Sequence, residues 1–289
     1  MGKTAIIFSN NDLSSVKRIY SIVHNSSLDQ IIWAIDGNES IPKFIESFSD
    51  KRNLITYSPE RQGKSASYNR ALRLITNDDV FLISADVVFQ PDVFDRICER
   101  VNGVGVALTN VVPMRRDGII RNIGSLLWII RDTQLRYFFT HGIPIHGGEF
   151  LYLKRKFIEK IPEVVNDDAY QCLNAQKHGA MAAYYEDLEI RNFVPSELME
   201  LINQRRRINY GHIELGKKLE NPSSISSLFF RNTKVTLSIL RMALKRNLKI
   251  IGLLPFLLVI EVLSRLSAQI DMLTDHDQIL WKNIETSKS

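Results

Sequence analysis

Several features that would define a class of protein outright are scarce or missing in this chain of 289 residues. It has only two cysteines, Cys98 and Cys172, which make neither a disulfide framework nor a zinc signature and favour a reducing compartment. We find no internal repeat and no low-complexity segment, and the hydrophobic content of 45% is ordinary. These absences exclude a disulfide-stapled domain, a fibre and a disordered chain, and they leave a globular fold with a sizeable core.

Signal-peptide and P-loop patterns are missing as well. The apolar part of residues 1–8 is too short for a secretory signal peptide, so we expect a cytoplasmic location. Gly63-Lys64-Ser65 is not a P-loop, because Ser58 stands where that motif needs its first glycine. The formal net charge of +5 suits an anionic ligand, a membrane surface or a nucleic acid, and does not choose among them.

Short apolar runs alternate with helical patterns along the first two thirds of the chain. Strands are predicted at residues 4–8, 31–35, 54–57, 80–83, 104–112, 150–153 and 181–185. Helices are predicted between most of them. This alternation predicts an α/β fold with a Rossmann-like, mostly parallel sheet and helices on both of its faces.

Polar residues stand at the carboxyl ends of three predicted strands: Ser9, Asp36 and Asp86. In open α/β sheets ligands bind at that edge, so we expect these side chains to lie close together. A carboxylate such as Asp86 suits a divalent cation that holds a diphosphate. The alternative is that Asp86 only begins the turn before Pro91.

Further candidates stand at predicted loops and helix starts. Lys64 begins a helix, where it faces either a phosphate or solvent. Asp167 and Asp168 begin another helix; capping explains one acid, and the second is a candidate general base. Arg205 and Arg207 belong to a basic run that either grips phosphate or forms a solvated helix face.

Taken in order, Asp36, Gly63-Lys64, Ser84-Ala-Asp86, Asp167-Asp168 and Gln204-x-x-Arg207 resemble the family 2 glycosyltransferases of the GT-A fold. The sequence is most similar to the membrane-associated branch with a cellulose-synthase-like core, over about residues 3–212. The resemblance implies that Asp168 is the general base and that Asp86 binds Mg²⁺ or Mn²⁺. The expected donor-binding residues are Ser9, Asp36, Lys64, Asn69, Asp86, Gln204, Arg205 and Arg207. The expected acceptor-binding residues are Gly147, Gly148, Glu149 and Asp167.

Two departures from the family pattern bear on mechanism. Ser84 replaces the first aspartate of the Asp-x-Asp metal motif, which weakens the metal site without removing it. Ile208 replaces the tryptophan of the Gln-x-x-Arg-Trp motif, which removes an aromatic platform for an acceptor sugar and argues against processive synthesis.

The resemblance implies an inverting transfer of a hexose from a nucleotide-sugar, GDP-mannose or a UDP-hexose, to a hydroxyl of a lipid-linked glycan. Mannose is inferred only by analogy with small lipid-directed relatives. Two alternatives remain: a transferase acting on a polyprenyl phosphate, and a nucleotide-sugar-binding protein that has lost catalysis, as the changes at Ser84 and Ile208 would allow.

The C-terminal part has no Asp or Glu from Asn221 to Ile260. At about 100° per residue, one helix face is basic and the opposite face is apolar, a pattern typical of a helix in a membrane interface with anionic lipid. The basic face holds Arg231, Lys234, Arg241, Lys245 and Lys249, and the apolar face holds Phe229, Leu237, Leu240, Leu244, Leu248 and Ile251.

Because the apolar run at 250–260 is too short to span a bilayer alone, we expect in-plane or shallow attachment. The alternative is that the run, extended through Leu266, inserts as a short or hairpin element. The sequence thus predicts a catalytic domain at 1–215, a membrane-associated part at 216–289 with a loose polar tail from Asp271, and a location at the cytoplasmic face. We do not expect nucleic-acid binding, because the apolar face of the C-terminal helix is aliphatic and base stacking prefers aromatic platforms.

Overall fold

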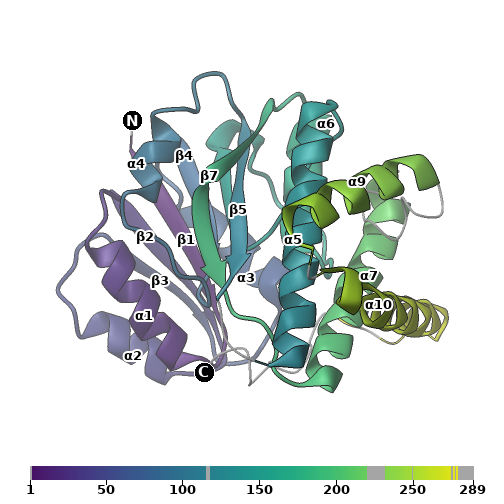
Figure 1. Ribbon diagram of the computed structural model, residues 1–289. Coiled ribbons are helices and arrows are strands. Elements are labelled where there is room, and N and C mark those ends of the chain that lie inside the picture. The colour runs from purple at the N-terminus through teal and green to yellow at the C-terminus, as the bar shows by residue number, and fades with distance from the viewer. Residues whose placement is uncertain are drawn as a thin grey trace. The chain divides into compact units, whose positions relative to one another are not determined.

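A computed structural model describes residues 2–114, 118–219, 232–248, 250–274, 276 and 278. The strands, in chain order (Figure 1), are β1 (Lys3–Ser9), β2 (Gln30–Asp36), β3 (Asn53–Ser58), β4 (Asp79–Ser84), β5 (Val106–Pro113), β6 (Phe150–Lys154) and β7 (Ala182–Asn192). The helices are α1 (Leu13–His24), α2 (Ser40–Glu46), α3 (Lys64–Ala71), α4 (Val93–Cys98), α5 (Ile119–Thr140), α6 (Asp167–Lys177), α7 (Leu198–Leu219), α9 (Thr233–Arg246) and α10 (Ile250–Leu273). Short 3₁₀ helices occupy Leu72–Leu74 and Arg155–Phe157.

The strands form a 7-stranded sheet in the order β3-β2-β1-β4-β6-β5-β7. β1 runs parallel to β2 and β4, and β2 runs parallel to β3. β6 is antiparallel to both β4 and β5. The predicted mostly parallel sheet is therefore confirmed, and β6 is an antiparallel insertion that strand length and hydrophobicity did not reveal.

The register of the parallel strands brings their carboxyl ends into one row. Phe8 of β1 lies opposite Ala34 of β2 and Ser84 of β4. Asp36 of β2 lies opposite Ser58 of β3. The expectation that polar strand ends share one edge of the sheet is confirmed.

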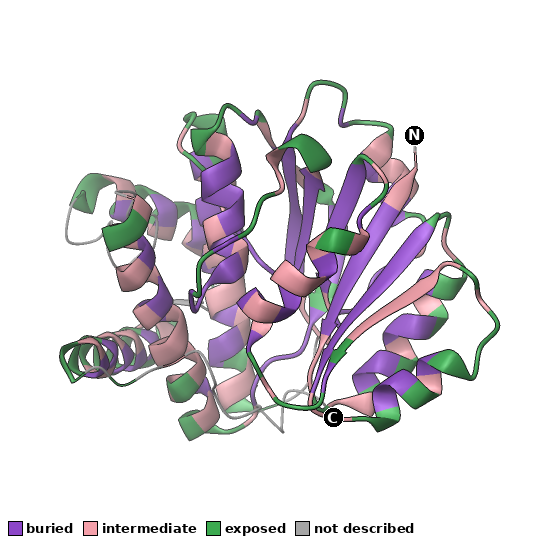
Figure 2. Ribbon diagram, turned by 180° about the vertical axis from the view of Figure 1, so that it is seen from behind, coloured by how far each residue is buried: buried purple, intermediate pink, exposed green. Residues whose placement is uncertain are grey.

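Helices cover both faces of this sheet, as expected from right-handed crossovers between parallel strands. Figures 1 and 2 show α1 and α2 on one face and α3 on the other. The Asp12 side chain caps α1 by accepting a hydrogen bond from the Ser15 backbone N–H at 3.1 Å. All residues of β2 are buried, as Figure 2 shows for the central strands, which explains its unbroken apolar sequence.

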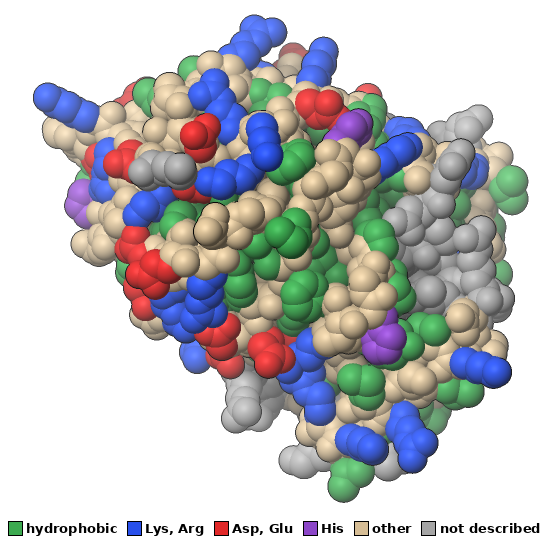
Figure 3. Space-filling view, turned by 90° about the horizontal axis from the view of Figure 1, so that it is seen from above, with side chains coloured by type: hydrophobic (Ala, Val, Ile, Leu, Met, Phe, Trp, Pro, Cys, Tyr) green, Lys and Arg blue, Asp and Glu red, His purple; other side chains and the backbone are tan. Residues whose placement is uncertain are grey.

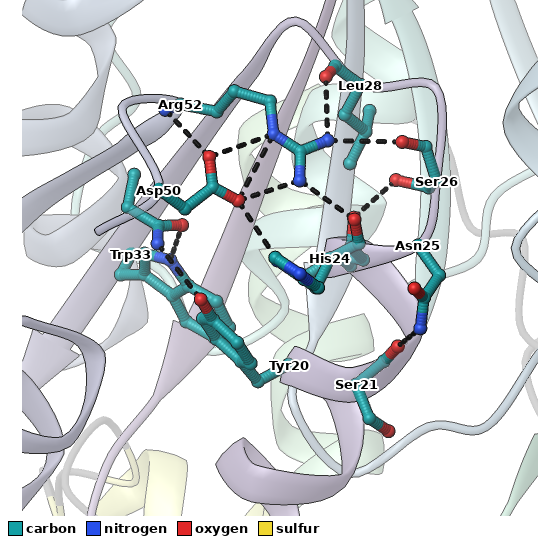
Figure 4. Close-up of polar contacts among 11 residues, drawn as sticks. Tyr20, Ser21, His24, Asn25, Ser26, Leu28, Trp33, Asp50 and Arg52 are labelled. Atoms are coloured by element: carbon teal, nitrogen blue, oxygen red, sulfur yellow. Dashed lines mark hydrogen bonds and ion pairs between the residues drawn. The ribbon is translucent and has the colours of Figure 1, made fainter. Parts of the chain in front are cut away.

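The residues just before β3 are held in place by an ion pair and hydrogen bonds of Arg52 (Figure 4). The Arg52 Nη2 atom lies 2.7 Å from Oδ2 of Asp50. The Arg52 Nη1 atom donates to the carbonyl oxygens of Ser26 at 3.1 Å and Leu28 at 3.2 Å. Hydrogen bonding from Arg52 lowers the pKa of Asp50 to about 2. Elsewhere on the surface, charged side chains of both signs are interspersed on the face in Figure 3.

The chain divides into two compact units. The first contains residues 1–110, 146–163 and 167–191, and the second contains 111–145, 164–166 and 192–289. Compact units need not coincide with domains, so the predicted domain boundary at residue 215 stays a prediction.

Two helices follow one another where the sequence indicated a single basic amphipathic helix. α9 ends at Arg246, and α10 begins at Ile250. Lys234, Arg241 and Lys245 are exposed on α9, but Leu237, which was expected on the apolar face, is exposed as well. Arg231, Lys249 and Phe229 lie outside the described residues, as does the side chain of Ile251.

α10 continues through Pro255 and is longer than the apolar run predicted from the sequence. Residues Gly252–Leu273 are, by length and composition alone, sufficient to cross a membrane. The prediction that a loose tail begins at Asp271 was wrong, because α10 extends to Leu273. Asp271 is buried in the last turns of α10, and its carboxylate is bound by the guanidinium of Arg206 on α7.

Candidate active site

The start of α3 brings a lysine to two carboxylates in the first unit. Lys64 follows Gly63, whose φ of 89° lies in the left-handed region that favours glycine. The Nζ atom of Lys64 lies 3.5 Å from Oδ2 of Asp167 and 3.9 Å from Oδ2 of Asp168. It also lies 5.2 Å from the ring centroid of Phe8, near the carboxyl end of β1. Predicted donor, acceptor and catalytic residues thus meet beside one edge of the sheet.

Gly148, in the loop before β6, lies against the start of α6. A Cβ atom added to Gly148 would lie 1.5 Å from Oδ2 of Asp168, so a side chain at this position would displace the carboxylate. Burial raises the pKa of the Cys172 thiol on α6, against a hydrogen bond with the Gly147 backbone. Gly148 is therefore needed for close approach of the backbone to α6, which explains this glycine of the motif that the sequence placed at the acceptor site.

Backbone hydrogen bonds connect this glycine loop to the strand end that carries Asp86. The N–H of Ser84 donates to the carbonyl oxygen of Glu149 at 3.0 Å, and the N–H of Ala85 donates to that of Phe8 at 3.0 Å. Asp86 follows directly and is half-buried. Asp86, Lys64 and the Gly148–Asp168 contact are thus linked through the ends of β1 and β4.

The residues present fit a divalent cation only together with a ligand. Within the described ranges, no three His, Cys, Asp or Glu side chains gather into a preformed metal site. Asp86 alone would supply the protein carboxylate, since Ser84 has a hydroxyl where the family motif has an acid. Mg²⁺ is often bound by one or two carboxylates plus substrate phosphates, so Asp86 with a diphosphate is a sufficient donor set.

Asp36 is used by the protein to shape the loop before Lys64. Its Oδ2 atom accepts hydrogen bonds from the backbone N–H groups of Gln62 and Gly63, both at 3.1 Å. Its Oδ1 atom is bound by the guanidinium of Arg70. These contacts hold the loop that leads into α3, and the predicted contact of Asp36 with the nucleotide stays a prediction.

Two other predicted donor-binding residues, Ser9 and Asn69, differ in their hydrogen bonding. The Ser9 hydroxyl is buried and makes no hydrogen bond within the described part of the chain. The Asn69 amide, in contrast, is bound on both sides by the backbone of Ile161: its Nδ2 donates at 2.9 Å, and its Oδ1 accepts at 3.0 Å. Ser9 is therefore available to a ligand, and Asn69 ties α3 to the segment that follows β6.

Arg61 is a candidate that the sequence analysis missed. It precedes Gly63-Lys64 in the loop held by Asp36, and it is half-buried. Burial lowers the pKa of Arg61, against the opposing effect of the nearby Asp36 carboxylate. Among the described residues, no hydrogen bond or ion pair is found for its guanidinium. A desolvated cation two residues before Gly63 is suited to an anionic ligand. The position of Arg61 next to the glycine-lysine motif is the feature of the sequence that could have identified it.

The predicted Gln204-x-x-Arg207 motif lies on α7, in the second unit. The Arg205 guanidinium is bound by Glu261 of α10, with Nη2 donating to Oε2 at 3.2 Å. Arg207 donates from Nη2 to the carbonyl oxygen of Val165 at 3.2 Å. Gln204 is half-buried on the same helix. Donor binding by these three residues stays a prediction.

α7 also holds the short segment 164–166, which runs directly into Asp167. The N–H of Val165 donates to Glu214 Oε2 at 2.9 Å, and the Asn166 amide donates to the carbonyl oxygen of Ile208 at 3.1 Å. A Cβ on Gly211 would lie 2.4 Å from the Asn166 side chain. The helix with the arginine motif therefore fixes the residues that precede the catalytic candidate in the chain. Whether Arg207 and Asp168 converge on one ligand stays a prediction.

A comparison with known families identifies the chain. Residues 18–211 match the family described as "Glycosyltransferase like family 2". This match covers more than half of the sequence, so the chain belongs to this family, and the predicted class, a nucleotide-sugar-dependent glycosyltransferase, is confirmed. The membrane-associated branch stays a prediction. No curated protein matches the chain significantly.

Solved structures confirm the GT-A-like fold. The mannosyltransferase PcManGT from Pyrobaculum calidifontis, in complex with GDP-Man and Mn²⁺, has a TM-score of 0.63 at 16% identity, over 95% of this chain and 88% of that one. S. aureus TarS 1–349 with UDP-GlcNAc has a TM-score of 0.52 at 11% identity, over 96% and 93%. Glucosyl-3-phosphoglycerate synthase from Mycobacterium tuberculosis, with Mn²⁺, UDP-Glc and phosphoglyceric acid, has a TM-score of 0.50 at 14% identity, over 72% and 77%.

Proposed function

We propose that the protein is an inverting hexosyltransferase that moves a sugar from a nucleotide-sugar to a hydroxyl of a lipid-linked glycan at the cytoplasmic face of a membrane. The observation that supports the proposal is the position of the Asp168 carboxylate and its contacts. Lys64 and Gly148 both lie against its carboxylate, in the unit whose sheet edge bears Asp86. A carboxylate fixed next to a lysine and close to an anion site is suited to deprotonate an acceptor hydroxyl.

In this mechanism Asp168 accepts the proton of the acceptor hydroxyl while its oxygen attacks the anomeric carbon from the face opposite the diphosphate. Lys64 orients the carboxylate and adds positive charge near the developing diphosphate. Arg207 binds the same diphosphate with its planar guanidinium. A single in-line displacement inverts the anomeric configuration. Bound beside Asp86, Mg²⁺ or Mn²⁺ would neutralise charge on the leaving group.

The donor is GDP-mannose or a UDP-hexose. Both have relatives in support: the mannosyltransferase PcManGT was solved with GDP-Man, and TarS with UDP-GlcNAc. We favour mannose, because the TM-score to PcManGT, 0.63, is higher than the TM-score to TarS, 0.52. Arg61 and Ser9 are proposed to contact the nucleotide or its diphosphate, since each presents a polar group that the described residues leave unbonded.

The acceptor is proposed to carry a lipid because the C-terminal helices are suited to a membrane surface with anionic lipid. The exposed basic side chains of α9 and the apolar length of α10 support this. Transfer of one sugar at a time is proposed because Ile208 offers no aromatic platform.

Calorimetric titration with GDP-mannose, UDP-glucose and UDP-GlcNAc in Mn²⁺ tests the donor assignment. We expect one of these to bind with micromolar affinity to the wild type and much more weakly to Asp86→Asn. Asp187→Asn, which removes an exposed surface carboxylate of the same unit, is the matched control and is expected to leave binding unchanged. Binding of no nucleotide-sugar, or equal binding by Asp86→Asn, would refute the proposed donor site.

A further inference from the structure

The outward face of α10 is apolar along nearly its whole length. Large hydrophobic side chains are exposed at spacings of three and four residues, and Gln269 is the one polar residue among them in the described part of this face. At about 100° per residue, these side chains cover one continuous side of the helix. They are Phe256, Leu258, Val259, Val262, Leu263, Leu266, Ile270 and Leu273.

The opposite face of α10 is packed inside the second unit and carries the two acids of the helix. Leu257, Ile260 and Ala268 are buried there, and Figure 2 shows buried and exposed residues alternating around the helix. Glu261 binds Arg205 of α7, and Asp271 binds Arg206 of the same helix. The two ion pairs are ten residues apart, so they fix roughly 15 Å of α10 against the protein.

The ion pair of Glu261 opposes a transmembrane position of α10 as it is packed here. Glu261 lies near the middle of the candidate span Gly252–Leu273, so a spanning helix would carry Glu261 and its partner Arg205 of α7 into the hydrocarbon of the bilayer. Charged side chains are unfavourable in hydrocarbon. The length and composition of α10 would permit a span, but its contacts oppose one.

The charges on α10 and on α9, which contacts it, suit an anionic membrane surface. On α9, within the described residues, Lys234, Arg241 and Lys245 are exposed and no acid is present. The acids of α10, Glu261 and Asp271, are both neutralised by arginines of α7. The described parts of the two helices therefore present hydrophobic and positively charged side chains outward, the combination that binds anionic lipid interfaces.

We infer that α10 is an interfacial docking helix: its outward face inserts in the plane of an anionic bilayer, and its inward ion pairs hold it to α7. This inference rests on the membrane attachment in the proposed function and adds the surface, its depth and its orientation. The occupant of the face is lipid. A second copy of the chain would also cover the apolar stripe, but it would leave the exposed basic side chains of α9 without a negatively charged partner surface, which an anionic bilayer supplies.

Fluorescent labelling of single cysteines tests the orientation. An environment-sensitive dye is attached to Phe256→Cys, Leu263→Cys or Ile270→Cys in the full chain, which is then mixed with phosphatidylcholine vesicles with or without phosphatidylglycerol. Burial raises the pKa of the native Cys98 to about 11 and also raises that of Cys172, so both label slowly at neutral pH. We expect a several-fold rise in emission at all three sites with the anionic vesicles, and equal quenching by lipids brominated near the headgroup.

The control is Met181→Cys, an exposed site in the first unit, where we expect no change. A spanning helix would instead show its deepest label at residue 263 and shallow labels at 256 and 270. A second copy would raise the emission with protein concentration and without vesicles. Either result, or no response to vesicles, overturns the inference. The measurement needs no sugar donor, so its failure and the failure of the transferase assignment are separable.

Discussion

At the scale of single residues, the site depends on a few charges that the fold holds at fixed positions. Lys64 lies between two carboxylates and the end of β1, and Asp36 holds the loop before it. The sequence indicated Lys64, Asp86 and Asp168 through motif order. The position of Arg61, two residues before Gly63, was the available sequence signal, but its partial burial and its lack of a partner among the described residues become visible only in the structure.

Replacing Arg61 with alanine is expected to weaken donor binding. A hydrogen bond to a charged group is worth about 1.5–3 kcal/mol, so KM for the nucleotide-sugar should rise roughly ten- to hundredfold while kcat changes little. Steady-state kinetics measure both constants. Arg73→Ala, at an exposed arginine of the following 3₁₀ helix, is the control and should behave like the wild type. An unchanged KM in Arg61→Ala would remove Arg61 from the donor site.

Asp50 is expected to make stability depend on pH in the acid range. Its pKa is about 2 in the folded protein and near 3.8 without its partners. A carboxyl with a depressed folded pKa stabilises the protein fully above its unfolded pKa, so this contribution is lost as the pH falls from about 4 to 2. Urea unfolding should show Asp50→Asn to be about 1–2 kcal/mol less stable at pH 7, with the difference from the wild type vanishing near pH 2. The control is Asp187→Asn, at an exposed pair with Arg100, which should lower the free energy of unfolding by less than about 1 kcal/mol. A stability difference between Asp50→Asn and the wild type that does not change with pH would contradict this assignment.

At the scale of elements, hydrophobic runs were sufficient to locate most strands and helices. β1 to β4 appear near their predicted residues, and α1 to α3 lie between them as expected, because buried parallel strands and amphipathic helices have distinct periods. The direction of β6 was not predictable, since pairing depends on contacts with β4 and β5 that are distant in the sequence. The boundary between α9 and α10, and the inclusion of Asp271 in α10, depend on tertiary partners such as Arg206 in the same way.

Two glycines of α7 provide a matched test of how this helix holds the segment before Asp167. A Cβ on Gly211 would lie within 2.4–2.6 Å of three Asn166 atoms, whereas a Cβ on Gly216 would meet nothing within 4 Å. Gly211→Ala should destabilise the protein by about 1–3 kcal/mol and reduce kcat through displacement of the segment. Gly216→Ala should be neutral or stabilising by up to about 1 kcal/mol, because alanine favours helices. Thermal unfolding and activity assays compare the two, and equal behaviour would show that Asn166 can move without consequence.

At the scale of the whole molecule, the C-terminal helices are part of the folded body. α10 packs on α7 with Leu257 and Ile260 buried and is held to that helix by two ion pairs, and α9 is joined to α5 by the contact of Arg246 with Asp132. The sequence indicated a membrane-associated appendage because it shows composition and periodicity but not these pairings. α7, the helix with the arginine motif, is therefore stabilised by its contacts with α10.

Ending the chain at Leu248 should consequently do more than abolish membrane attachment. It would uncover the inner face of α7 and leave Arg205 and Arg206 without their carboxylates. We expect a lower melting temperature and loss of activity even in detergent solution, measured by calorimetry and by product formation. A truncated protein with wild-type stability and activity would show that α10 is dispensable and serves only as an anchor.

The proposed sugar transfer depends on removal of the acceptor proton by Asp168, and the Asp168→Asn variant tests this step. Wild type and Asp168→Asn are each incubated with the nucleotide-sugar that binds, Mn²⁺ and a membrane lipid extract, and release of nucleoside diphosphate is followed by ³¹P NMR. The account predicts release by the wild type and a loss of roughly 10²–10⁴-fold in Asp168→Asn, with donor affinity retained. Equal rates in the two proteins, or no release by a wild type that binds the donor, would contradict it.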